Sequence, residues 1–97
     1  MSELVFESDE DKARHNLRKH RVDFEEAKTV FADPRAALFH DEDHSAAEER
    51  ELVIGYSDRN RLLIVSFTER HCDVIRIISA RLATKREQTH HEKSQGR

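Results

Sequence analysis

A change in hydrophobic spacing at Asp33 and Pro34 constrains the fold more than any other feature of the sequence. Before this point apolar residues recur every three or four positions, as on one face of a helix. After it they come in short runs separated by polar turn clusters, as in β-strands. Proline lacks the backbone donor that a continuing helix needs and disfavours a helical conformation in the preceding residue. The sequence therefore predicts an α+β domain with helices first and a sheet after them.

Two helices are predicted before Pro34. Ser8, followed three residues later by Asp11, marks the start of the first helix, which we place at residues 9–20. Asp23 and Glu26 form the pattern of a capping box for the second helix, and Val22 can act as its hydrophobic staple. The second helix directs apolar side chains inward from Phe24, Ala27, Val30 and Phe31.

Four strands are predicted after Pro34, at residues 36–40, 50–56, 61–67 and 74–80. The short connections at 57–60 and 68–73 favour antiparallel neighbours, and hence a four-stranded meander. Residues 4–6 are expected to add a short edge strand. A last helix begins near Thr84, whose hydroxyl can cap it while Glu87 returns the bond.

Length and composition predict a single domain, residues 1–97, because 36% hydrophobic residues in 97 suffice for one core. The lone Cys72 cannot form an intrachain disulfide, and the first residues lack the features of a secretory signal. No apolar run reaches the roughly 20 residues that span a bilayer. We therefore expect a cytoplasmic protein with no membrane association, and a disordered tail at residues 93–97.

The net charge of −3 conceals an uneven distribution. Residues 1–49 carry 7 Lys/Arg and 14 Asp/Glu, whereas residues 50–97 carry 10 and 6. A basic second half on an acidic chain indicates a confined anion-binding face, although chance scatter in a charge-rich sequence is the alternative. With only 2 glycines, the chain has no glycine-rich phosphate loop.

The last predicted strand carries the densest set of candidate functional residues. In a regular strand, Arg76 and Arg81 would leave the sheet on opposite faces. Arg76 interrupts an aliphatic run, so it is either ion-paired, for example to Glu51 or Glu69, or held ready for a phosphate. The sequence leaves both alternatives open.

Histidines offer two further candidate sites. His20, next to Lys19 at the end of the first helix, can move protons near neutral pH, but a cation there also stabilises the helix dipole. The cluster of His40, Asp41, Asp43 and His44 lacks zinc-like spacing and has the character of a solvated acidic loop. We therefore predict no metal and no cofactor. His90 and His91 are expected to lie in a fraying helix end.

Several segments resemble the family of BrnT toxins. In the first half these are Phe6-Glu7, Asp11-Lys12-Ala13, Asn16-Leu17, Lys19-His20, Phe24-Glu25-Glu26-Ala27 and Val30-Phe31-Ala32-Asp33-Pro34. In the second half they are Glu49-Arg50, Ile54-Gly55, Thr68-Glu69-Arg70, Ala83-Thr84, Arg86-Glu87 and, most specific of all, Arg76-Ile77-Ile78-Ser79-Ala80-Arg81. The resemblance covers residues 4 to about 90.

The resemblance implies a RelE-like α+β toxin that cleaves RNA, inhibits translation and is neutralised by a BrnA-type antitoxin, a DNA-binding ribbon-helix-helix protein. Cleavage without a metal needs a base, an acid and a charge stabiliser. By this analogy Arg70, Arg76 and Arg81 contact the phosphate, and His20 or Glu69 handles protons. The expected RNA-binding residues are Lys19, Arg50, Lys85 and Arg86.

Three positions depart from the family pattern, and one of them is a late aromatic residue near Glu92 that is replaced by histidine here. Ser8 stands where many members have Trp, and Arg21 stands where Gly usually follows Lys-His, which removes an expected helix C-cap glycine. The alternative function is therefore a catalytically weakened binding module that holds a DNA-binding antitoxin and tunes repression of its own operon.

Overall fold

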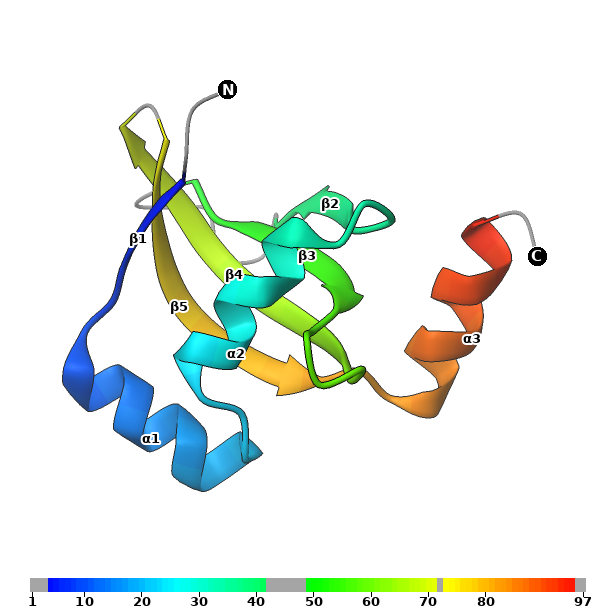
Figure 1. Ribbon diagram of the computed structural model, residues 1–97, viewed down its shortest axis with the longest axis horizontal. Coiled ribbons are helices and arrows are strands. Elements are labelled where there is room, and N and C mark those ends of the chain that lie inside the picture. Colours follow the sequence, from blue (N-terminus) through cyan, green and yellow to red (C-terminus); the bar gives the residue numbers. More distant parts are fainter. Residues whose placement is uncertain (1–3, 42–48, 72, 96–97) are drawn as a thin grey trace.

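The computed structural model describes residues 4–41, 49–71 and 73–95 and has a five-stranded sheet as its centre (Figure 1). The elements are β1 (Val5–Glu7), α1 (Glu10–His20), α2 (Phe24–Thr29), the 3-10 turn η1 (Val30–Ala32), β2 (Ala37–His40), β3 (Glu51–Tyr56), β4 (Leu62–His71), β5 (Val74–Leu82) and α3 (Lys85–Ser94). No helix in these ranges is long and apolar enough to cross a membrane.

The sheet corrects the predicted topology. Strands β2 to β5 form the expected antiparallel meander, but β1 adds a fifth strand that pairs parallel to β5, giving the order β1-β5-β4-β3-β2. The sheet is therefore mixed and five-stranded, not antiparallel and four-stranded. Strand β4 also continues to His71, through residues expected to form a loop.

The predicted helix caps need two corrections. Asp9, not Ser8, caps α1, because its carboxylate accepts a bond from the Asp11 amide. Asp23 caps α2 as expected, but the Glu26 side chain does not return the bond and instead reaches Ser57 and Arg61. Of the helices in the described residues, only α3 has a complete capping box, formed by Thr84 and Glu87.

The hydrophobic core lies between α2 and one face of the sheet, and Figure 1 shows α2 crossing in front of the strands. The expected inward residues of the second helix are buried or packed on the core, and Phe31 stacks edge-on against Phe67 with ring centroids 5.0 Å apart. The buried members are Val22, Phe24, Ala27, Val30, Val53, Leu63, Val65, Phe67, Ile75, Ile77 and Ala80. The core is mostly aliphatic, with Phe24 and Phe67 as its buried aromatic side chains.

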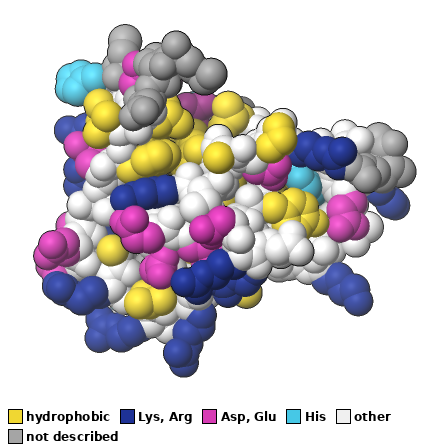
Figure 2. Space-filling view, in the orientation of Figure 1, with side chains coloured by type: hydrophobic (Ala, Val, Ile, Leu, Met, Phe, Trp, Pro, Cys, Tyr) yellow, Lys and Arg dark blue, Asp and Glu magenta, His cyan; other side chains and the backbone are white. Residues whose placement is uncertain are grey.

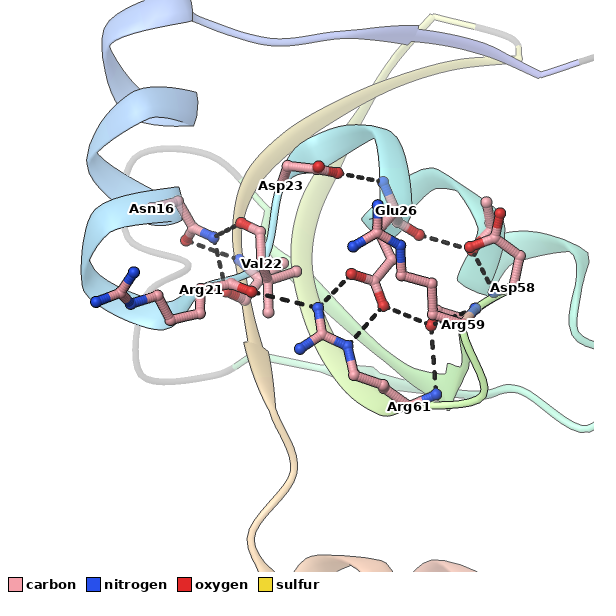
Figure 3. A network of polar contacts seen from close by, with 11 residues as sticks. Asn16, Arg21, Val22, Asp23, Glu26, Asp58, Arg59 and Arg61 are labelled. Atoms are coloured by element: carbon pink, nitrogen blue, oxygen red, sulfur yellow. Dashed lines mark hydrogen bonds and ion pairs between the residues drawn. The ribbon is translucent and has the colours of Figure 1, made fainter.

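Asn16 fixes α1 to β5, beyond the point where β1 ends (Figure 3). Its amide group donates to the carbonyl oxygens of Ala80 (2.8 Å) and Val22 (2.9 Å) and accepts from the Ala80 amide (3.0 Å). Because Asn16 is buried, these bonds satisfy polar groups that water cannot reach. One side chain thus replaces a neighbouring strand at this edge of the sheet.

A second polar network joins α2 to the β3–β4 turn (Figure 3). The buried Glu26 carboxylate binds the Arg61 guanidinium at both oxygens and accepts from the Ser57 hydroxyl at 2.6 Å. The bond to Arg61 holds the pKa of Glu26 below its ordinary value, against the opposing effect of burial. Arg61 also donates to the carbonyl oxygen of Arg21, which links the turn to the end of α1.

Candidate functional site

The sheet face that points away from α2 carries the candidate site. Along β4, Leu63, Val65 and Phe67 enter the core, so the alternate residues Ile64, Ser66 and Thr68 lie on the opposite face. Their cross-strand partners share that face, because directly paired residues project on the same side of a sheet. The register therefore shows which side chains of β5 belong to it.

A β-bulge in β5 brings Arg76 and Arg81 to this one face. Thr68 pairs with Arg76 and Ile64 pairs with Arg81, but Ile78 has no partner, because the register shifts between Ser66 and Phe67. The extra residue reverses the alternation of the rest of the strand. The expectation that the two arginines leave opposite faces is therefore wrong, since it assumed a regular strand.

Two more arginines join them, and we name the set Arg50, Arg70, Arg76 and Arg81 the arginine face. Arg50 directly precedes β3, where Glu51 pairs with Phe67, and extending this register by one residue sets Arg50 opposite Thr68. Arg70 has no register partner, and its Nε lies 3.8 Å from Oε1 of Glu7. The arginine face thus draws on three neighbouring strands.

Glu7 of β1 is the partner of Arg76, with Oε1 3.4 Å from Nη1. It lies directly beside Arg76 in the parallel register of β1 and β5, and it also faces Arg70. Neither Glu51 nor Glu69, the partners considered from the sequence, takes this position in the described structure. Both contacts are long and part exposed, so they hold the arginines weakly.

Arg81 is held more firmly, by Glu87 at the start of α3. Its two terminal nitrogens donate to the two carboxylate oxygens at 2.8 and 2.9 Å. Glu87 also closes the capping box with Thr84, and the bond from Arg81 is the main cause that lowers its pKa to about 2. Next to it, Lys85 and Arg86 are exposed in the first turn of the helix, where they add positive charge.

Lys19 and His20 lie elsewhere, in an open hollow between α1 and the edge of β5. The hollow has a volume of about 650 Å³, and Ile78 and Ser79 form its β5 side. Figure 2 shows Lys and Arg side chains gathered along the lower edge of the molecule, where Figure 1 places α1. Ser79 pairs with Ser66 on the arginine face, so the hollow meets that face at the edge of β5.

Glu69 is not brought to the arginine face. It pairs with Ile75, whose side chain enters the core, so its own side chain leaves the sheet on the α2 side. Among the described residues, neither Glu69 nor His20 forms a hydrogen bond or ion pair with an arginine of the face. The structure therefore assembles the expected phosphate contacts but not the expected proton carriers.

Thr68 is a candidate residue that the sequence reasoning missed. Its side chain is buried, yet its hydroxyl oxygen has no hydrogen-bond partner in the described part of the chain, and the same holds for Nε of Arg50. Buried polar groups without partners are rare in native proteins. Only the strand register shows that Thr68 stands between Arg50 and Arg76, so no local sequence pattern identifies it.

The C-terminal helix packs against the sheet more closely than the sequence indicated. His91, expected in a fraying end, is buried and lies against Tyr56 with ring centroids 6.3 Å apart. Between α3 and the sheet runs an apolar groove of about 390 Å³. Helix α3 continues to Ser94, within the tail predicted to be disordered, and residues 96–97 lie outside the described ranges.

The acidic loop falls mostly outside the described residues, which exclude Asp43, His44 and Cys72. In the ranges that are described, no group of three or more His, Cys, Asp or Glu side chains could hold a metal ion.

Comparison with known proteins identifies the family. The protein-family model described as the ribonuclease toxin BrnT of type II toxin-antitoxin systems matches residues 9–87 of this sequence. The crystal structure of the Brucella abortus ribonuclease toxin BrnT has a similar fold, with a TM-score of 0.62 and 23% identity over 88% of this chain and 100% of that one. No curated protein matches. Since the family model spans most of the sequence, the chain belongs to the BrnT family of ribonuclease toxins of type II toxin-antitoxin systems.

Proposed function

We propose that this toxin cleaves RNA on the arginine face without a metal ion, and thereby inhibits translation in the cytoplasm. The observation that carries the proposal is the convergence of Arg50, Arg70, Arg76 and Arg81 on one side of the sheet. When a ribose 2′-hydroxyl attacks the neighbouring phosphate, negative charge builds up on the phosphate oxygens. Fixed guanidinium groups stabilise that charge, as a metal ion otherwise would.

Arg81 is the residue best placed to stabilise the transition state. Its guanidinium already binds a carboxylate through two parallel bonds, which is the geometry in which arginine binds a phosphate. Because the pair is part exposed, a phosphate can take the place of Glu87. Lys85 and Arg86 in the adjacent turn attract the strand to this point.

His20 remains our proposed proton carrier, and Lys19 an RNA contact. The hollow that both residues line reaches Ser79, which lies between Arg76 and Arg81 on the strand. An RNA strand bound on the arginine face therefore passes the hollow where the RNA crosses the edge of β5. Glu69 is the less suitable carrier, because it leaves the sheet on the other side.

A specific observation supports a second candidate function. Three arginines of the face already have carboxylate partners, Glu7 for Arg70 and Arg76, and Glu87 for Arg81. Such pairs are also typical of purely structural contacts. In this alternative the domain is a weakened toxin whose main task is to hold its antitoxin and tune repression of the operon.

The partner that we propose is a BrnA-type antitoxin, a DNA-binding ribbon-helix-helix protein, in a hetero-oligomeric complex. Membership of a type II family implies a protein antitoxin. The arginine face is the surface that such a partner has to cover in order to block RNA.

Cleavage of RNA by the purified toxin in the presence of EDTA tests the proposal. We expect Arg81→Ala to lose about 100-fold or more in rate, the usual effect of removing one transition-state donor. Arg59→Ala, in the exposed β3–β4 turn, is the matched control and should keep wild-type activity. Growth of a bacterial host after induction should stop with the wild type and continue with Arg81→Ala.

The alternative makes the opposite prediction. If the folded wild-type protein leaves RNA intact and its induction leaves growth unimpeded, the ribonuclease proposal is wrong and the binding module is favoured. Activity that requires an added divalent metal would refute metal independence alone.

A further inference from the structure

We infer that the arginine face has a second phosphate subsite, built around the Thr68 hydroxyl between Arg50 and Arg76 and separate from Arg81. The inference rests on the proposed function and extends it, because two subsites define the substrate as a strand that presents phosphates at two places.

Thr68 and Arg50 supply the first observation. Thr68 is 3% exposed, and both its Oγ1 and Nε of Arg50 are buried with no hydrogen-bond partner among residues 4–41, 49–71 and 73–95. A threonine on an otherwise apolar stretch of strand could be replaced by valine with no loss of packing volume. A hydroxyl kept there unpaired is instead available to a ligand that enters from the arginine face.

The chemistry around Thr68 fits a phosphate. Thr68 pairs directly with Arg76, and the register of β3 and β4, extended by one residue, sets Arg50 on its other side. Paired side chains stand about 5 Å apart at Cβ, so one phosphate group can contact all three. The hydroxyl and the guanidinium groups are donors, whereas phosphate oxygens accept, and the positive charges of the arginines attract the singly charged phosphodiester.

Entry of the phosphate needs only side-chain movement. Thr68 is covered in the free protein, but Arg50 and Arg76 are only half-buried. Arg76 is held by Glu7 at 3.4 Å, a long contact that an incoming anion can displace. Either arginine can therefore turn outward and bind the phosphate from above while the hydroxyl binds it from below.

The distance to Arg81 separates the two subsites. Arg81 pairs with Ile64, four residues before Thr68, which corresponds to about 13 Å along the strand. One phosphate group cannot reach both positions. Between them lies the pair of Ser66 and Ser79, both with small side chains. One nucleotide cannot span this distance, so the two subsites would hold phosphates that are not neighbours in the RNA. The substrate is therefore an extended single strand laid along β4 and β5.

Binding of a non-cleavable strand tests the subsite directly. The probe is a fluorescent single-stranded RNA in which every ribose is 2′-O-methylated, so that no attack can occur. We expect Thr68→Val to weaken binding about tenfold, since it removes a hydrogen bond to a charged group without changing volume. Thr68→Ser keeps the hydroxyl and should bind like the wild type. Thr89→Val, an exposed threonine of α3, is the matched control.

A second variant tests the subsite independently of Thr68, and a double mutant tests whether the two subsites are separate. Arg50→Lys keeps the charge but removes the Nε donor, so it should also weaken binding if Thr68→Val fails to fold. Thr68→Val and Arg81→Ala should have additive effects on the binding free energy, because the subsites do not touch. Strong non-additivity would overturn the idea of two separate subsites.

Parallel cleavage assays on the all-ribose strand separate this inference from the proposed function. If Thr68→Val binds the probe as tightly as the wild type while the wild type cleaves RNA, the subsite is wrong and the ribonuclease stands. If Thr68→Val weakens binding although no variant cleaves, the subsite stands and the ribonuclease proposal fails.

Discussion

Two carboxylates of this toxin form similar pairs with arginine but differ in what the pair can do. The Glu26 side chain is 1% exposed and is surrounded by Arg61 and Ser57, so loss of its partner would leave a buried charge. The Glu87 side chain is 35% exposed, and its pair with Arg81 lies at the surface. Burial therefore makes the first pair structural, whereas the second can exchange its carboxylate for a phosphate.

The Glu87 pair predicts an acid-sensitive contribution to stability. The pKa of Glu87 is lowered from 4.5 to about 2, so its contribution is fully present above pH 4.5 and is lost as the pH falls toward 2. We expect Glu87→Gln to remove that part of the pH dependence, by no more than about 1 kcal/mol because the pair is part exposed. Urea unfolding between neutral pH and pH 2 measures it.

Glu25→Gln is the control, since Glu25 pairs with Lys28 on the exposed side of α2. Its stability should follow the wild-type curve in shape. Identical pH curves for the wild type and Glu87→Gln would show that the Arg81 pair does not form in solution.

At the scale of the elements, short sequence patterns correctly predicted the features that depend on residues close together in the chain, namely helix caps, helix ends and strands. Asp23 and Thr84 cap their helices as their sequence patterns indicate, and the helical segment ends before Pro34. Strand periodicity likewise found β2 to β5. Each of these patterns involves residues only a few positions apart, so it can be recognised in the sequence without knowledge of the fold.

The arrangement of the candidate residues depends on pairing between strands that are far apart in the sequence. The bulge at Ile78 depends on how β5 fits β4, and nothing in the alternation of apolar residues announces it, yet it moves Arg81 to the other face. In the same way, the pairing of Glu7 with Arg76 follows from the parallel register of β1, and the position of Thr68 follows from β3 and β5 together. The sequence therefore singled out the arginines as candidates, but it gave neither their grouping on one face nor Thr68.

At the end of α1 an arginine occupies a C-cap position that favours glycine, and we expect this to lower the free energy of unfolding. Arg21 occupies the C-cap with φ of 60°, in the left-handed region, and its amide closes the helix on the Leu17 carbonyl. A side chain in this conformation costs roughly 1 kcal/mol relative to glycine. We therefore expect Arg21→Gly to raise the free energy of unfolding by about this amount, as measured by urea denaturation.

Asn60 offers a comparison, because it also has a positive φ, of 61°, in the β3–β4 turn. Asparagine tolerates this region better than arginine, so Asn60→Gly should gain less. Equal or smaller gains for Arg21→Gly would mean that the Arg21 side chain stabilises the fold by contacts that outweigh its backbone strain.

At the scale of the whole molecule, positive charge is concentrated on two adjoining surfaces. The arginine face comes from the basic half of the sequence, as expected. The hollow beside α1 comes from the acidic half, because Lys12, Lys19 and their neighbours on the helix are gathered there by folding. The two surfaces meet at Ser79, so an RNA strand can use both while the net charge stays at −3.

This arrangement predicts the salt dependence of RNA binding. For single strands, the logarithm of the association constant falls with the logarithm of salt concentration by about 0.7 for each neutralised phosphate. If the strand crosses from the arginine face into the hollow, Arg76→Ala and Lys19→Ala should each reduce this slope by about 0.7, and the double variant by about 1.4. Lys28→Ala, on α2, should leave the slope unchanged. A wild-type slope for Lys19→Ala would confine the RNA to the arginine face and remove His20 from the reaction as well, since the two residues share the hollow.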